Sequence, residues 1–206
     1  MKTIIKMIIA VIMTGSCTAE DAVHRVKILK ITSDIQKTPS FTVSGVKNKS
    51  TKPRNWLEIE AEVEVETTSK SKFIPEITAN WYVVVKDSTN DKAVRLLGSV
   101  TFKNIRTKDK KIFLSAYIEP DTLERLTGKE RPSDSDIEAV ALTIEGSGIF
   151  TQGKYALGLE KATAKEESRW WDEWKQESLR DLIVAKSTTP FAPLWSDRYP
   201  TEKVKK

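Results

Sequence analysis

Apolar and charged residues alternate strictly along residues 57–66, the most regular stretch of the chain. Leucine, isoleucine, alanine or valine occupies each odd position, and glutamate occupies each even position from Glu58 to Glu66. A period of two is typical of a β-strand with one face in the core and the other in solvent. We therefore predict a half-buried strand with five glutamates on its outer face.

Other segments carry the β-branched and aromatic residues that strands favour. The strongest is residues 77–86, where Trp81 is expected in the core between two sheets. Further strands are expected at residues 26–31, 41–46, 96–105, 112–118, 137–145 and 149–157, with one or two helical turns at residues 120–128. About seven to nine short strands without a long helix between them predict a mostly β domain, an antiparallel immunoglobulin-like β-sandwich, over residues 20–158.

The composition changes near residue 160. Residues 159–186 contain no glycine or proline, carry many charges of both signs and include three tryptophans. This composition predicts a C-terminal helix. Three prolines then follow within residues 187–206 and predict an extended tail.

The first residues have the pattern of a secretion signal. Two lysines precede an apolar run over residues 7–13, which is too short to span a bilayer. Two interpretations of the next residues stay open: cleavage after Ala19 would remove residues 1–19, whereas acylation of Cys17 in a loose lipobox would anchor the chain to a membrane. Either way we expect an exported protein in the periplasm, in the outer membrane or at the cell surface.

The counts of cysteine, histidine and charge exclude several function classes. Cys17 is the only cysteine and His24 the only histidine, so neither a disulfide, a metal site of these residues nor a nucleophile triad is expected. No phosphate loop is present. The net charge of +5 falls to +3 without residues 1–19, too little to indicate nucleic-acid binding. We expect no enzyme, no catalytic residue, no cofactor and no metal.

The glutamate row of residues 58–66 allows two interpretations. It could bind a divalent cation or a basic partner, or it could be a solvated face offset by lysines on neighbouring strands, for example Lys27, Lys30 or Lys103. Calcium sites usually gather oxygen atoms from a folded loop. We therefore expect the solvated face.

The C-terminal region concentrates four of the six tryptophans within residues 170–195. From the sequence, this region could either pack on its own domain or contact a partner. Exposed aromatic residues anchor many protein interfaces, and we predict a partner contact through Trp170, Trp171, Trp174, Phe191, Leu194, Trp195 and Tyr199. On this hypothesis, deleting residues 187–206 would leave the melting temperature almost unchanged.

The whole-chain pattern resembles a known bacterial family. It combines the signal, a sandwich without cysteine, the sequence SRWWDEWK at residues 168–175 and the sequence PFAPLWSDRYP at residues 190–200. These features are similar to the small immunoglobulin-like envelope proteins of the type IV pilus-like gene cluster of Akkermansia. The resemblance implies an envelope location, a likeness to archaeal pilin and flagellin domains, a pilus-associated role and no catalytic residues.

The N-terminus departs from the pilin pattern, because it lacks a glycine cleavage site followed by a long hydrophobic assembly helix. An accessory or scaffold role is therefore expected in place of polymerisation. The expected partners are envelope or pilus-machinery proteins or a second copy of the chain, and a membrane only through a lipid on Cys17. The alternative is a secreted or surface-held glycan-binding module.

Overall fold

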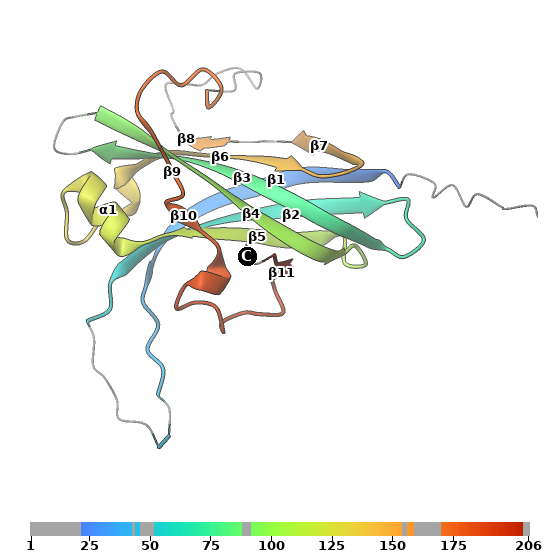
Figure 1. Ribbon diagram of the computed structural model, residues 1–206, viewed down its shortest axis with the longest axis horizontal. Helices are drawn as coiled ribbons and strands as arrows, with labels where there is room; N and C mark the ends of the chain where they lie inside the picture. Colours follow the sequence, from blue (N-terminus) through green and yellow to red (C-terminus); the bar gives the residue numbers. More distant parts are fainter. Residues whose placement is uncertain are drawn as a thin grey trace, which may run out of the picture.

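A computed structural model describes most of the chain, namely residues 22–42, 44–45, 52–87, 92–153, 156–158 and 170–203. The predicted signal over residues 1–19, including Cys17, lies outside the described residues. So does the first part of the predicted C-terminal helix, residues 159–169. The described chain forms two β-sheets that pack face to face (Figure 1).

The strand order of each sheet mixes early and late segments of the chain. The first sheet has the order β10 (Ile183–Val184), β5 (Lys111–Ile118), β2 (Asn55–Thr67), β1 (His24–Lys37) and β7 (Ile149–Gly153). The second has the order β11 (Thr201–Glu202), β4 (Lys92–Arg106), β3 (Phe73–Asp87), β6 (Ile137–Glu145) and β8 (Ala156–Gly158). The short strand β9 (Ser178–Arg180) also pairs with β4.

The sheets are mixed, which corrects the expectation of an antiparallel sandwich. Most neighbouring strands are antiparallel, but β7 runs parallel to β1 and β9 runs parallel to β4. The direction of β7 follows from its connection. Only three residues separate it from β6, and the chain passes in this turn from the second sheet to the first. It thus reaches the free edge of β1 in the same direction as that strand.

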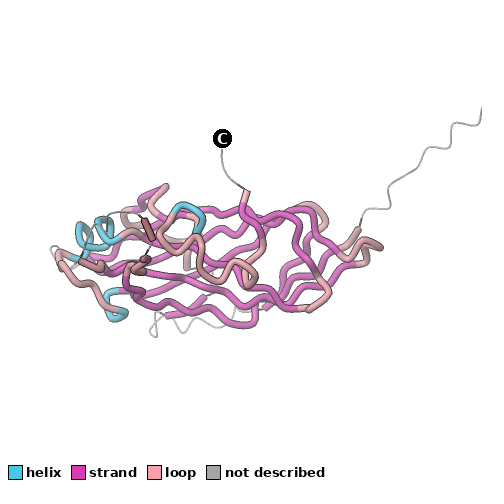
Figure 2. The backbone as a smooth tube through the Cα atoms, turned by 90° about the horizontal axis from the view of Figure 1, so that it is seen from below, coloured by secondary structure: helices cyan, strands magenta, loops and turns pink. Residues whose placement is uncertain are grey.

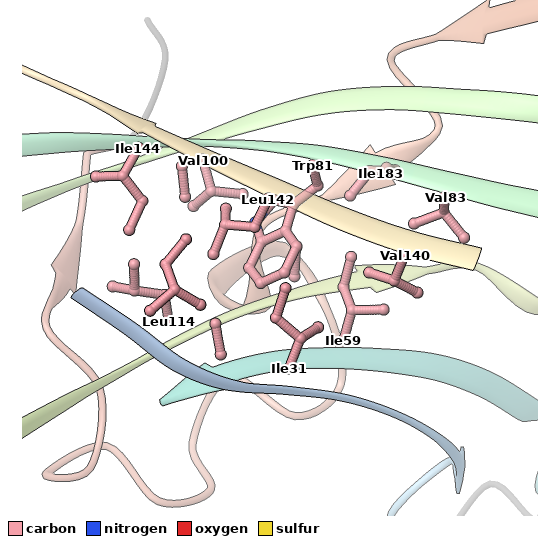
Figure 3. Close-up of a cluster of buried hydrophobic side chains, with 14 of the residues drawn as sticks. Ile31, Ile59, Trp81, Val83, Val100, Leu114, Val140, Leu142, Ile144 and Ile183 are labelled. Atoms are coloured by element: carbon pink, nitrogen blue, oxygen red, sulfur yellow. The ribbon is translucent and has the colours of Figure 1, made fainter. Parts of the chain in front are cut away.

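The predicted strand phase is confirmed in both sheets. In β2 the inner residues Leu57, Ile59, Ala61, Val63 and Val65 are all buried in the core. Trp81 of β3 is also fully buried, and Figure 3 shows its ring surrounded by aliphatic side chains from both sheets. Burying a large apolar side chain contributes about 1.5–3 kcal/mol, so the inner faces of these two strands contribute substantially to the stability of the core.

The predicted helical turns at residues 120–128 are also confirmed. Helix α1 (Pro120–Thr127) begins with proline at its first position and ends at Gly128, whose φ of 68° is readily adopted by glycine. The backbone N–H of Gly128 donates to the carbonyl of Glu124. Leu123 and Leu126 point into the core, so α1 closes one end of the sandwich, while β1 begins at the other end (Figures 1 and 2).

The C-terminal region differs from the predicted helix over residues 159–186. Its described part, residues 170–186, forms turns and the strands β9 and β10, followed by a short 3₁₀ helix η3 (Lys186–Thr188). The edge of β4 supplies the reason, because Arg95 N–H donates to the carbonyl of Glu177 and Asp181 N–H donates to the carbonyl of Leu97. Tertiary pairing overrides a local preference for helix.

The tail is also not the extended segment that the prolines predicted. Residues 190–198 form successive turns before β11 joins β4. Because β9, β10 and β11 are members of the two sheets, the sandwich extends well beyond the predicted boundary at residue 158.

Candidate functional site

The seven residues predicted to contact a partner lie in two separate places. Trp170, Trp171 and Trp174 lie near β3 and β4 of the second sheet. The other four belong to residues 185–203, which we call the C-terminal strap because this segment runs from β10 of the first sheet to β11 of the second.

Phe191 anchors the strap to the outer face of the first sheet. Only 2% of this residue is exposed. Its ring stacks on that of Tyr117 with a centroid distance of 5.0 Å, and it meets Trp56 edge to face at 5.9 Å. Leu194 packs against the same cluster. Phe191 therefore stabilises its own domain, and its side chain is not available to a partner while the strap is in place.

The strap also binds the glutamate row of β2. Arg198 donates two hydrogen bonds to the Glu60 carboxylate, at 3.1 and 2.8 Å, and the Tyr199 hydroxyl donates a third at 2.5 Å. The Arg198 guanidinium lies 3.5 Å above the ring of Phe113. Burial, together with the hydrogen bond to Glu60, raises the pKa of Tyr199, so the phenol stays protonated as the donor.

Glu58 lies beneath the strap and is buried. It accepts a hydrogen bond from the Tyr117 hydroxyl. Desolvation nevertheless raises the pKa of the Glu58 carboxyl, because burial outweighs the stabilising hydrogen bond. This carboxyl thus holds its proton to a higher pH than an exposed glutamate does.

These contacts correct the prediction that the whole glutamate row is a solvated face. The strap covers Glu58 and Glu60, whereas Lys111 forms an ion pair with Glu62 at 2.5 Å. The prediction of lysines on the neighbouring strand is right for β1, whose register places Lys30 opposite Glu62 and Lys27 opposite Glu64. It is wrong for Lys103, which lies in the second sheet.

A second set of polar contacts fixes the ends of the strap to each other. The Glu202 carboxylate accepts the backbone N–H groups of Lys186 and Ser187, at 3.0 and 2.8 Å. The buried Lys186 side chain donates to the carbonyl of Ala192 at 3.1 Å and lies 5.4 Å from the ring of Tyr199. Burial lowers the pKa of Lys186. Deleting residues 187–206 would remove most of the strap and expose these apolar and ionisable groups. We therefore expect the deletion to lower the melting temperature, which is the opposite of the result predicted from the sequence.

The three tryptophans of residues 170–174 pack on one another. Trp170 meets Trp171 edge to face at 5.7 Å and lies 6.1 Å from Trp174. Trp171 is buried against Tyr82, and Arg95 donates to its carbonyl. Trp170 and Trp174 remain half-buried.

Trp195 is the most accessible of the seven residues, because 52% of it is exposed. It lies in the strap at a φ of 53°, a left-handed conformation that residues other than glycine rarely adopt. Tyr199 and Leu194 are partly buried beside it. A partner contact stays a prediction, and the surface that could make it is centred on Trp195.

Sequence reasoning missed a groove at the opposite end of the sandwich from α1. Its volume is about 980 Å³, and its lining comes from β2, β3, β4 and two loops that connect the sheets, one from β2 to β3 and one from β4 to β5. The signal that could have found it is the lysine content of two loops, residues 69–72 and 107–110.

Two further findings concern metal and membrane chemistry. Among the residues that the structure describes, no group of three histidine, cysteine, aspartate or glutamate side chains could hold a metal ion. No helix in the described part of the chain is long and apolar enough to cross a membrane.

Comparison with known proteins agrees with the resemblance seen in the sequence. A protein-family model matches residues 17–206, nearly the whole chain. The chain belongs to this family. A crystal structure of a protein from Akkermansia muciniphila has a TM-score of 0.75 to this chain, covering 90% of it and 96% of the other protein. The two sequences are 21% identical, so this likeness shows a shared fold. No match was found among curated proteins.

Proposed function

We propose that the chain is an exported, non-enzymatic structural or interaction protein of the bacterial cell envelope, acting as an accessory or scaffold component of a type IV pilus-like system. Membership of the family is the observation that carries this proposal, since the match spans residues 17–206. An immunoglobulin-like classification of the sandwich is part of the same proposal.

The geometry of the groove and of the strap supports a binding function better than a catalytic one. The 980 Å³ groove is lined by a single carboxylate, Glu66, whereas carboxylate-based glycoside hydrolysis needs two facing ones. The strap gives the sandwich a preformed outer surface with Trp195 exposed on it. Tryptophan is enriched among the residues that dominate protein interfaces.

Fractionation and affinity purification test the proposal. A chain with a C-terminal tag, expressed in its own bacterium, should appear in the envelope fraction and co-purify with pilus-machinery proteins. Trp195→Ala should weaken that co-purification while leaving the fold intact, and Glu130→Ala, which changes an exposed residue of the loop after α1, should not. Retention in the cytoplasm, or capture of glycans without envelope proteins, would contradict the proposal.

A further inference from the structure

Four basic side chains line the groove at the end of the sandwich where β1 begins. They are Lys72, Arg106, Lys108 and Lys110, and Glu66 is the only carboxylate among the lining residues. None of the four forms an ion pair with another residue that the structure describes. The neighbouring Asp109 is exposed and does not line the groove. The groove thus holds a surplus of positive charge without an internal partner.

The backbone holds two of these lysines in fixed positions. Lys72 and Lys110 end the two loops that connect the sheets, β2 to β3 and β4 to β5, at φ angles of 58° and 57°, where glycine or asparagine is favoured. The loops are bonded together, because Thr107 donates to the carbonyl of Lys72 through both its N–H and its hydroxyl, at 3.1 and 2.9 Å. At both positions the chain has a lysine, although the left-handed backbone conformation there disfavours lysine.

Exposed apolar side chains surround the same end. Among the residues that the structure describes, three large hydrophobic ones with high exposure lie here: Val23 at 39%, Phe73 at 44% and Phe150 at 60%. Phe73 lines the groove itself. The register pairs His24 with both Thr67 and Ile149, so Val23 and Phe150 also lie at the end of the sandwich where the groove is.

The described part of the chain also begins at this end. The first described residue is Ala22, just before β1 (Figure 1). Four residues lie between it and the candidate lipidation site Cys17, and the five steps along the chain bound the distance between the two at about 18 Å. A lipid on Cys17 would therefore hold this end of the sandwich close to a bilayer.

We propose that this end of the sandwich docks on the surface of an anionic phospholipid membrane. The basic side chains of the groove face the lipid phosphates, and the exposed phenyl groups enter the interfacial layer. Buried apolar area and attraction to anionic lipids together set the strength of such binding. The proposal rests on the exported location under Proposed function, but membrane docking by the folded domain itself goes beyond it.

Vesicle sedimentation tests the docking without any lipid anchor. The chain from Glu20 onward, which keeps the whole described sandwich, should bind vesicles of phosphatidylcholine mixed with phosphatidylglycerol and not vesicles of phosphatidylcholine alone. High salt should release it. Each basic residue near an anionic surface strengthens binding by roughly fivefold, so Arg106→Gln with Lys108→Gln should weaken it by about 25-fold.

A matched variant controls for total charge. Arg125→Gln with Arg131→Gln removes the same charge near α1, at the opposite end, and should leave vesicle binding unchanged. Phe150→Ser should weaken binding without lowering the melting temperature. The docking proposal fails if the parent does not bind anionic vesicles, if both charge variants lose binding equally, or if a soluble anionic polysaccharide binds and vesicles do not. None of these results depends on the pilus-associated role, which the co-purification experiment tests separately.

Discussion

Replacing Phe191 with alanine tests whether the C-terminal strap is part of the fold. The side chain is almost fully buried between Tyr117 and Trp56, at ring distances of 5.0 and 5.9 Å. Truncating a buried phenylalanine to alanine costs about 3–5 kcal/mol in the free energy of unfolding. The cluster lies on the outer face of a sheet, where the strap can shift and fill part of the cavity. We therefore expect the lower end, about 3 kcal/mol.

Guanidinium denaturation followed by tryptophan fluorescence measures this change, and Trp56 is a reporter in contact with the substituted position. Trp195→Ala is the matched control, because it removes an exposed aromatic residue from the same strap and should change the free energy of unfolding by about 0.5 kcal/mol or less. If Phe191→Ala is as stable as the control, the strap does not stabilise the sandwich, and the reasoning from its packing is refuted.

Substitutions at three further positions probe the rest of the fold. Trp81→Ala should lower the free energy of unfolding by about 3–5 kcal/mol, whereas Trp81→Phe should cost less, because the indole N–H has no hydrogen-bond partner among the described residues. Gly98→Ala should cost about 1–3 kcal/mol by denaturation, since its Cβ would lie 2.5 Å from that of Ile183 and displace β10. Glu58→Gln should reduce the pH dependence of stability. The raised pKa of Glu58 makes its stabilising contribution complete at low pH and lost as the pH rises through that pKa. The parent should therefore lose stability relative to the variant as the pH rises above the ordinary titration range of a glutamate, and equal slopes of melting temperature against pH would contradict this.

The sequence predicts those strands whose own pattern of apolar and polar residues is sufficient to identify them, whatever strands they pair with. The alternation at residues 57–65 fixes the inner face of β2 whatever strands lie beside it, and the apolar run around Trp81 is long enough to identify a central strand. The helix α1 was predictable for the same reason, since Pro120 and Gly128 mark its ends locally.

The C-terminal region could not be predicted in this way. Its charged composition without glycine or proline favours a helix, but the edge of β4 offers backbone groups that pair with β9, and the core takes up Ile183. Asp181 also adopts a left-handed φ of 61°, which a helix excludes. The sequence predicts a partner contact for the aromatic residues of the tail, yet Phe191 packs on Tyr117 and Trp56 of its own sheet.

The most direct test of the proposed role is photo-crosslinking at position 195 in living bacteria. A photoreactive phenylalanine analogue in place of Trp195 would lie on the exposed surface of the strap, and the same analogue in place of Glu130 would lie on the loop after α1. The account predicts a crosslink from position 195, and none from position 130, to an envelope or pilus-machinery protein or to a second copy of the chain. Equal crosslinking from both positions, or none from position 195, would contradict it.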